Sequence, residues 1–344
     1  MKPVPWLFPL SWLYGAGVGV RNWLYENGLL RTHNVGIPVV SVGNLSAGGT
    51  GKTPFVEYLA RNLCDRGKKV AVLSRGFRRA TKGYVVVSNG RQVCAEASAS
   101  GDESAQMARN LEGVVIAVDE DRVHGASELL RAFHPDVMLL DDGFQHRALG
   151  RALDIVILSS EELLNVPKML PAGLLREPLR ALARADVLVV SGFADAEEYR
   201  HAASRLRTFD KPVVGIRKTV TGMTALVTGN PVNRERVAGR FAAFSGIGRP
   251  GGFHRSLREY LGDPLALEVF DDHHWYTPRD LQRLEHMAKN AGAEYLVTTQ
   301  KDAVRLERIK ELAELDGRIP LVVLAISVEV IDGEERLRKR MEEL

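Results

Sequence analysis

The segment that most constrains the fold of this chain runs from residue 39 to residue 54 and reads VVSVGNLSAGGTGKTP. A β-branched apolar run leads into a glycine-rich loop that ends in GKT (51–53), and an apolar helical pattern follows. In such a unit the backbone N–H groups surround phosphate oxygens, the lysine reaches the β- and γ-phosphates, and the threonine hydroxyl can bind Mg²⁺. Ser46 stands where the motif G-x-x-x-x-G-K-[ST] has glycine, so we expect Gly48 and Gly49 to supply the flexibility of the loop. The segment predicts a nucleoside triphosphate site formed by Gly48, Gly49, Thr50, Gly51, Lys52 and Thr53.

The composition excludes several classes of protein. The chain has 344 residues, 45% of them hydrophobic, which is enough for two domains. A net charge of +3 gives no field that would attract nucleic acid, and we expect neither a nucleic-acid nor a protein partner. Two cysteines cannot form a disulfide framework and suit a reducing compartment.

Apolar strand-like runs alternate with helical patterns between residues 37 and 191. This alternation predicts an α/β fold with a mainly parallel sheet of the P-loop NTPase type and helices on both faces. Further on, the chain reads as two extended segments with a turn at Thr221-Gly222, then as a smaller α/β pattern that ends in a charged, solvated helix. We therefore expect an N-terminal segment (1–35), a nucleotide-binding domain (36–210), a hairpin linker (211–230) and a smaller α/β domain with a C-terminal helix (231–344).

The N-terminal segment is rich in aromatic residues. It contains Trp6, Trp12 and Trp23, and its uncharged run from residue 3 to residue 20 is interrupted by prolines and glycines. The run is short and interrupted for a membrane-spanning helix, which needs about 20 apolar residues. It also has no clear small-residue cleavage site, which a signal peptide needs. Aromatic residues flanked by arginines favour an element that lies in the membrane interface. The alternative is a hydrophobic arm packed on its own domain.

Two groups of acidic residues are candidates for chemistry beside the phosphates. Asp141 and Asp142 end the apolar run DVMLL, and P-loop enzymes hold Mg²⁺ with an acid at the end of such a strand. A simple turn at Asp142-Gly143 is the alternative. Asp102, in GDE (101–103), either caps the helix that follows it or accepts the proton of an attacking hydroxyl.

Four other motifs are less specific. The basic run RGFRR (75–79) follows a strand, where open α/β sheets bind ligands, and predicts contact with an anionic partner. The pair Arg176-Glu177 is either a functional loop or a surface ion pair. His273, in DDHH (271–274), either orients a proton-accepting group or is a solvated loop histidine, and no third spaced histidine or cysteine supports a metal centre. TQKD (299–302) loosely resembles the guanine-reading loop of GTPases.

Taken together, these blocks resemble the tetraacyldisaccharide 4′-kinase family, the lipid A 4′-kinases of bacteria with an outer membrane. The resemblance extends from the aromatic N-terminus to Leu306, and its blocks occur in the family's order. Phe77 and Gln300 depart from the family pattern, which more often has tyrosine and glutamate at these positions. The blocks are GNLSAGGTGKTP (43–54), LSRGF (73–77), GDE (101–103), DDGFQHR (141–147), LPAGLLREP (170–178), SGIG (245–248), DDHH (271–274) and TQKDAVRL (299–306), of which the first, fourth and fifth are the most specific.

The resemblance implies a kinase that moves the γ-phosphate of ATP, with Mg²⁺, to the 4′-hydroxyl of a tetraacyldisaccharide 1-phosphate, yielding lipid IVA. It also implies a peripheral protein on the cytoplasmic face of the bacterial inner membrane, where its acylated disaccharide substrate lies. By motif position, Lys52 and Thr53 bind phosphate and Mg²⁺, Asp102 is the base, and His273 is its partner. The metal shell would contain Asp141, Asp142 and Glu177, and the substrate would meet Arg75, Arg78, Glu103, Arg122, Gln145, His146 and Arg176.

Two other classes of protein fit parts of the pattern. A membrane-attached regulatory GTPase would use the same P-loop together with TQKD (299–302). A non-catalytic lipid-binding protein would use ATP only structurally. Nucleotide preference and lipid-dependent ATP consumption distinguish both from a kinase.

Overall fold

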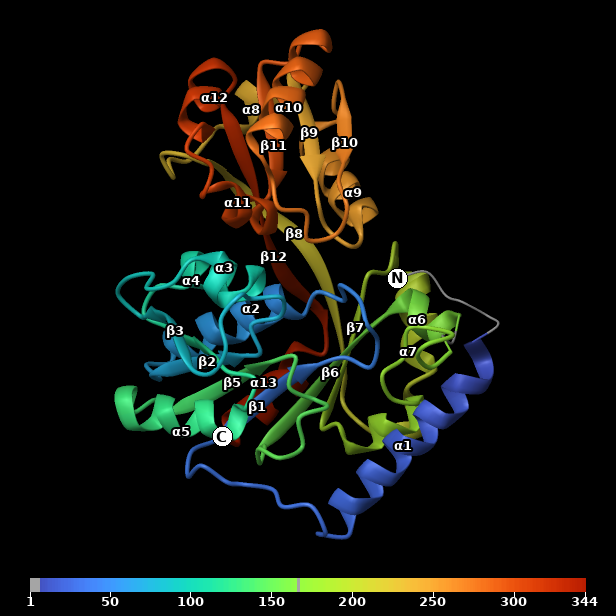
Figure 1. The fold of residues 1–344 in the computed structure, drawn as a ribbon. Coiled ribbons are helices and arrows are strands. Elements are labelled where there is room, and N and C mark those ends of the chain that lie inside the picture. Colours follow the sequence, from blue (N-terminus) through green and yellow to red (C-terminus); the bar gives the residue numbers. More distant parts are fainter. Residues whose placement is uncertain (1–6, 166–167) are drawn as a thin grey trace.

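The computed structural model describes residues 7–165 and 168–344, so Trp6 lies outside the described part of the chain. Within it, one 12-stranded sheet passes through two lobes in the order β10-β9-β11-β12-β8-β7-β6-β1-β5-β2-β4-β3 (Figure 1). The strands are β1 (Val39–Gly43), β2 (Val70–Ser74), β3 (Val85–Asn89), β4 (Val115–Val118), β5 (Val137–Asp141), β6 (Leu153–Ser159), β7 (Val187–Ser191), β8 (Val213–Ala225), β9 (Phe241–Ser245), β10 (Leu267–Val269), β11 (Tyr295–Thr299) and β12 (Leu321–Asp332).

The helices divide between the two lobes in Figure 1. The larger lobe contains α1 (Phe8–Glu26), α2 (Lys52–Asp65), α3 (Ala97–Ser100), α4 (Asp102–Asn110), α5 (Arg122–Phe133), α6 (Ser160–Leu164), α7 (Ala196–Ser204), α13 (Glu334–Glu342) and the 3₁₀ helices η2 (Leu179–Arg184) and η3 (Arg207–Phe209). The smaller lobe contains α8 (Arg234–Val237), α9 (Pro250–Leu261), α10 (Pro278–Asn290), α11 (Gln300–Leu306) and α12 (Leu312–Arg318).

The larger lobe has the predicted P-loop architecture. The apolar runs identified in the sequence form β1 to β7, and these strands are parallel except for β3, which pairs antiparallel with β4. Alternate residues of β1 face opposite layers: Val40 packs with α2 and α4, and Val39 packs with α5. Because both faces of the sheet are covered, its strands are uniformly apolar rather than alternating. The predicted fold class is confirmed.

The predicted hairpin linker is wrong. β8 is one continuous strand that leaves the larger lobe, enters the smaller one and pairs antiparallel with β12 along its length. The expected turn at Thr221-Gly222 is a bulge, because Gly222 pairs with Ala325 and Val220 with Ile326, which leaves Thr221 as an extra residue. The link between the lobes therefore consists of two strands about 100 residues apart in the chain.

The C-terminal helix also differs from the expectation of a solvated helix. The apolar side chains of Leu337 and Met341 in α13 are buried in the core of the larger lobe, together with Val56 and Val214. Only the outer face of α13 carries the predicted charges. The chain thus returns to the larger lobe after building the smaller one, so the region 231–344 does not form one lobe.

Helix α1 lies along the outside of the larger lobe (Figure 1). Its buried residues are Ser11 and Val18, whereas the side chains of Trp12 and Leu13 are 72% and 71% exposed. No helix of the described residues is both long enough and apolar enough to cross a membrane. The exposed apolar face is large for a helix of a globular domain, since such helices normally bury it.

Candidate active site between the lobes

The topology brings three of the predicted motifs to one edge of the sheet. β1 pairs in parallel with β5, and β5 pairs in parallel with β2. The carboxyl ends of parallel neighbours lie at the same edge, which is where α/β sheets bind ligands. The glycine-rich loop after β1, the acids after β5 and the basic run 75–79 after β2 therefore face the same space.

The glycine-rich loop has the predicted form, but a different glycine provides its unusual backbone conformation. Gly51, at the N-cap of α2, has a φ of 94°, whereas Gly48 and Gly49 are not in the left-handed region. The Asn44 amide donates to the Gly48 carbonyl at 3.3 Å and to the Thr50 hydroxyl at 3.2 Å, which fixes the loop from below. The loop leads its backbone N–H groups into the N-terminus of a 14-residue helix, a site suited to phosphate.

Ser46, the departure from the motif, has a partner of its own. Its hydroxyl donates a hydrogen bond to Glu162 of α6, and its backbone forms a bridge with Leu175. A glycine at this position would lose the first of these contacts. The loop 170–178 is thereby held directly against the P-loop.

Lys52, Asp142 and Arg176 form a compact charge cluster. Lys52 Nζ lies 3.4 Å from Asp142 Oδ1, and Arg176 donates two hydrogen bonds of 2.9 Å to the same carboxylate. Asp142 has a φ of 56°, which turns its carboxylate back toward these cations. Burial would raise the pKa of Asp142, but the two cations lower it well below its usual range. The cluster positions the Lys52 ammonium at the start of α2.

Asp141 has the properties of a Mg²⁺ ligand. Its side chain is buried, and its Oδ1 has no hydrogen-bond partner among the described residues. Burial and the adjacent Asp142 raise the pKa of Asp141 to about 7. No group of three or more His, Cys, Asp or Glu within the described residues could hold a metal by itself. This fits Mg²⁺, which is typically bound by one or two carboxylates together with substrate phosphates and water, and Thr53 follows Lys52 as the hydroxyl donor.

The structure does not bring Glu177 to this cluster. Its carboxylate is fully buried and accepts hydrogen bonds from Arg184 at 3.0 Å and from Asn22 of α1 at 2.8 Å. Arg21 lies 3.6 Å away. Glu177 therefore attaches α1 to the larger lobe, and its neighbour Arg176 is the member of the pair that reaches the P-loop.

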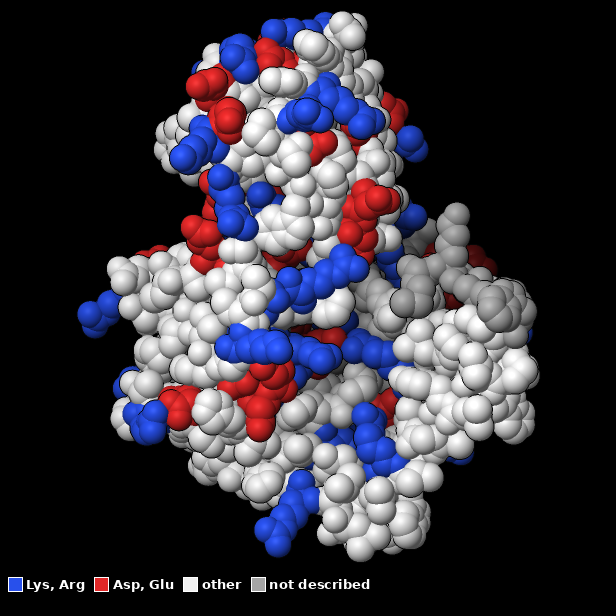
Figure 2. Space-filling model, in the orientation of Figure 1, with Lys and Arg blue, Asp and Glu red and all other residues white. Residues whose placement is uncertain are grey.

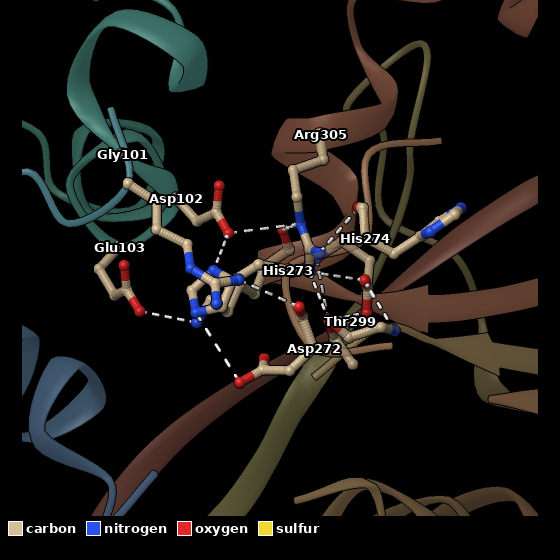
Figure 3. A network of polar contacts seen from close by, with 12 residues as sticks. Gly101, Asp102, Glu103, Asp272, His273, His274, Thr299 and Arg305 are labelled. Carbon is tan, nitrogen blue, oxygen red and sulfur yellow. Dashed lines mark hydrogen bonds and ion pairs between the residues drawn. The ribbon is translucent and has the colours of Figure 1, made fainter. Parts of the chain in front are cut away.

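The predicted pair Asp102 and His273 meets across the two lobes (Figure 3). His273 Nδ1 lies 2.9 Å from Asp102 Oδ2, and the side chains are 10% and 6% exposed. Asp102 is the first residue of α4, yet among the described residues the hydrogen bond found for its side chain is that with His273, and no backbone N–H of α4 donates to it. The geometry thus favours the partnership with His273 over the capping alternative.

Gly101 explains how Asp102 is presented. Gly101 has a φ of 86°, and a Cβ at this position would lie 2.9 Å from the Phe77 carbonyl oxygen. Only glycine allows the turn before α4 to pack this closely on the loop after β2. The Phe77 ring in turn packs edge-on against the His273 ring, with centroids 5.6 Å apart. The GDE and LSRGF blocks therefore form one structural unit.

Charges around Asp102 keep it ionised. Burial alone would raise the pKa of Asp102, but the hydrogen bond with His273 and the charges of Arg305 and Lys301 lower it overall. Glu103, predicted to meet the substrate, instead pairs with Lys301 of the smaller lobe at 2.6 Å. This ion pair is one of the contacts that hold the two lobes together beside Asp102.

The remaining predicted substrate residues lie around the same edge. Figure 2 shows Lys and Arg side chains gathered across the waist of the molecule, between the lobes. Among the predicted residues Arg75 is exposed, Arg78 donates to the Asp272 carbonyl at 3.3 Å, and Arg122 is buried and donates to the Glu120 carbonyl. The Gln145 amide donates to the Asn44 carbonyl at 3.0 Å.

His146 differs from these cations because it is neutral at physiological pH. Burial and the nearby charge of Arg122 lower the pKa of His146 to about 4. Its Nε2 is buried without a hydrogen-bond partner among the described residues. A neutral imidazole can donate or accept a hydrogen bond but adds no charge to the site.

Two cations that lie against the P-loop were not predicted from the sequence. Arg249 of the smaller lobe lies against the P-loop, with its Nη2 3.3 Å from the position of a Cβ on Gly48. Lys218 of β8 approaches Gly51 in the same way, with Cε at 3.2 Å. Arg249 follows the SGIG block directly, but no local pattern links either residue to the P-loop.

The fold and this site define a two-lobed P-loop kinase. The family model described as Tetraacyldisaccharide-1-P 4'-kinase matches residues 4–344, and the chain belongs to that family. The tetraacyldisaccharide 4'-kinase of Chlorobium phaeovibrioides is 39% identical over 342 residues, covering 98% of this chain and 97% of the relative. That of an Anaeromyxobacter species is 37% identical over 334 residues, covering 96% and 88%.

A solved structure extends this similarity to the whole fold. The crystal structure of LpxK from Aquifex aeolicus in complex with ATP is similar with a TM-score of 0.78 and 33% sequence identity, and 98% of each chain is covered. The predicted family and activity are confirmed, and the chain is an ATP-dependent lipid kinase. The regulatory GTPase alternative is not favoured. Asp302 of TQKD, the block that loosely resembles a guanine-reading loop, is buried and accepts hydrogen bonds from Tyr276 and Gly246, so its carboxylate is occupied within the protein.

Proposed function

We propose that the chain phosphorylates the 4′-hydroxyl of a tetraacyldisaccharide 1-phosphate with Asp102 as general base and His273 as the group that orients it. The observation that carries this proposal is the 2.9 Å contact between Asp102 and His273, two buried side chains from different lobes. No hydrogen bond to Asp102 Oδ1 is found within the described residues, so this oxygen is available to a hydroxyl. A general base must lie within hydrogen-bond reach of the proton that it accepts.

In this mechanism the substrate hydroxyl oxygen attacks the γ-phosphorus, the bond from that phosphorus to the β–γ bridging oxygen breaks, and ADP leaves. Asp102 Oδ1 accepts the hydroxyl proton, while Oδ2 keeps its hydrogen bond with His273. Lys52, positioned by Asp142, neutralises charge on the transferred group. Mg²⁺ bound near Thr53 and Asp141 would add positive charge at the β- and γ-phosphates.

The acceptor would approach from the basic waist of the molecule. Arg75, Arg78 and Arg122 provide cations close to the edge where the P-loop ends, and a sugar phosphate is the anionic partner expected there. His146 can supply a neutral hydrogen-bonding group beside them. These assignments predict that substitutions at the three arginines raise the KM for the lipid more than the KM for ATP.

The direct test is incubation with γ-labelled ATP and a tetraacyldisaccharide 1-phosphate in mixed micelles. A kinase transfers the label into the lipid, whereas a regulatory GTPase releases labelled phosphate and prefers GTP. Lipid-dependent transfer from ATP, lost in Asp102→Asn, is the expected result. Transfer at the wild-type rate in that variant would remove Asp102 from the mechanism.

We also propose that α1 attaches the protein peripherally to the cytoplasmic face of the inner membrane. The proposal is supported by the exposed side chains of Phe8, Trp12, Leu13 and Trp23 on a helix whose polar side chains anchor it to the larger lobe. In Figure 2 the surface at the lower right, where Figure 1 places α1, carries few charges. Aromatic side chains are favoured at the level of lipid headgroups.

Vesicle flotation of Trp12→Ser/Leu13→Ser tests this role. Loss of two exposed apolar side chains should reduce partitioning to anionic vesicles about 10-fold or more without lowering Tm, since neither side chain is in the core. Leu265→Ser/Leu267→Ser is a matched control, because these leucines of the smaller lobe are 48% and 39% exposed. Equal partitioning of both variants and wild type would refute the interfacial role of α1.

A further inference from the structure

The smaller lobe contains one unusual buried side chain, that of Arg305. It lies in α11 and, among the described residues, is the largest side chain that is almost completely buried, at 1% exposure. A guanidinium keeps its charge at all relevant pH values, so its burial is costly unless the charge is fully paired. The contacts of this charge therefore indicate its role.

Arg305 contacts Asp102 and the backbone around His273 (Figure 3). Its Nε lies 3.5 Å from Asp102 Oδ2, the same oxygen that faces His273. Its Nη1 donates to the His274 carbonyl at 2.9 Å, and its Nη2 donates to the Gly246 carbonyl at 3.0 Å. One planar group thus reaches the carboxylate of the larger lobe and two backbone positions of the smaller lobe.

These backbone contacts hold the loop that carries His273. His273 has a φ of 63°, a left-handed conformation that is unfavourable for a residue with a side chain. The His273 N–H donates to the Gly246 carbonyl at 3.1 Å, the same carbonyl that Arg305 binds. With the next carbonyl, that of His274, also bound, Arg305 fixes the chain on both sides of the imidazole.

Asp302 holds Arg305 in place. Its Oδ1 lies 2.7 Å from Arg305 Nη2 and also accepts hydrogen bonds from Tyr276 Oη at 2.8 Å and from the Gly246 N–H at 3.0 Å. The Asp302 side chain is itself fully buried. The network therefore leads from Asp302 through Arg305 to the Asp102 carboxylate and, through the Gly246 carbonyl, to the backbone of His273.

We propose that Arg305, anchored by Asp302, is the positioning residue that fixes the Asp102–His273 pair across the two lobes. The inference rests on the proposed role of Asp102 as the base. Arg305 is not expected to touch ATP or the acceptor. It holds Asp102 Oδ2 toward the smaller lobe, which leaves Oδ1 for the hydroxyl. A lysine could pair with Asp302 but could not also reach Gly246 and His274, because it lacks the planar fork of donors.

The experiment compares four variants of the full chain: Arg305→Met, Arg305→Lys, Arg305→Met/Asp302→Asn and the control Arg308→Met. Arg308 is a half-exposed arginine near the same helix that pairs with Glu96 across the lobes, so it matches the lost charge without contacting the pair. The measurements are kcat and the ATP KM in the label-transfer assay, the pH dependence of kcat, and Tm.

We expect Arg305→Met to lower kcat about 100-fold, the typical result of misplacing a catalytic group by an ångström, with the ATP KM within about twofold of wild type. The acid limb of the kcat profile should move to higher pH, because the Arg305 charge no longer lowers the pKa of Asp102. Lys301 and His273 remain as the charged or titratable groups that lower this pKa. Arg305→Lys should recover only part of kcat. Arg308→Met should show none of these changes.

The double variant separates positioning from stability. Arg305→Met leaves Asp302 buried without its cation and should lower Tm, whereas Arg305→Met/Asp302→Asn removes both charges and should recover Tm without recovering kcat. If the single variant does not fold, the double variant and Arg305→Lys carry the same comparison. Recovery of kcat together with Tm, or an unshifted acid limb, would show a purely structural pair and overturn the inference. The proposed role of Asp102 as general base is refuted by a different result, a wild-type kcat in Asp102→Asn.

Discussion

Replacing Asp102 by asparagine should lower kcat about 10²- to 10⁴-fold, the usual contribution of a positioned general base. Asparagine keeps the shape of the side chain and can accept a hydrogen bond from His273, so the variant removes the proton acceptor with little effect on packing. The side chain is only 6% exposed, which limits the access of water as a substitute base. ATP affinity should change little, because the P-loop contacts are unaffected.

The partner residue should matter less, and the two losses should not multiply. His273→Ala removes the hydrogen bond to Asp102 Oδ2 but leaves Arg305 3.5 Å from the same atom, so we expect a kcat loss of about 10- to 100-fold. In Asp102→Asn there is no base left for His273 to orient. The double variant should therefore resemble Asp102→Asn alone, which corresponds to a coupling free energy of about 1.4–2.7 kcal/mol.

The assay is label transfer at saturating ATP and lipid, with ATP affinity measured by competition and Tm measured for every variant. Strictly multiplicative losses would refute a shared role and indicate that Asp102 and His273 act independently. A helix-capping role for Asp102 predicts yet another result, a stability loss of about 0.5–2 kcal/mol with kcat preserved.

Three other predictions concern the charged groups of the larger lobe. Lys52→Ala should reduce transfer nearly to background while Tm stays close to wild type, because Arg176 still pairs with Asp142; transfer near the wild-type rate would refute the P-loop assignment. Because the folded pKa of Asp141 is raised to about 7, the stability of the wild type should fall as pH rises from about 4 to 7. Asp141→Asn should therefore be about 2–4 kcal/mol more stable than wild type at pH 8 without Mg²⁺, and equal stability of the two proteins in thermal melts would refute this. Glu177→Gln should loosen α1 and speed proteolysis after residue 26 with Mg²⁺ affinity unchanged, whereas a lower Mg²⁺ affinity would restore Glu177 to the metal shell.

The parts of the fold that depend on residues close together in the sequence were predictable. The seven apolar runs of the larger lobe form β1 to β7, and the GKT block opens α2, because periodicity and glycine placement act over a few residues. The β8–β12 link was not predictable, since β8 forms its pairs with a strand about 100 residues later. Leu337 and Met341 of α13 were missed for a related reason: two apolar residues in a charged helix acquire meaning only from the core that they join.

The site divides in the same way. Lys52 and Asp142 could be identified from short motifs, because each lies at the end of a predicted strand or loop. The role of Asp102 could not be decided locally, since capping and base catalysis require the same residue at the same helix start. Its partner His273 lies 171 positions away, and only the family resemblance joined the two before the structure did. Glu177 was assigned to the metal by its motif position in the family resemblance. In the structure its neighbour Arg176 reaches the P-loop, while Glu177 pairs with Arg184, because adjacent side chains in an extended loop point in opposite directions.

TQKD (299–302) shows how a local rule can build a long-range site. The Thr299 hydroxyl accepts the Asp302 N–H at 3.0 Å and donates to the Asp302 carboxylate at 2.6 Å, so the motif that loosely resembles a guanine-reading loop is the N-cap of α11. This cap turns the Asp302 carboxylate into the protein, where Tyr276 and Gly246 bind it. Arg305 follows three residues later, one helical turn along the same face, and can therefore pair with Asp302 while reaching toward Asp102. A helix cap in the smaller lobe thus determines where the carboxylate of the larger lobe is held.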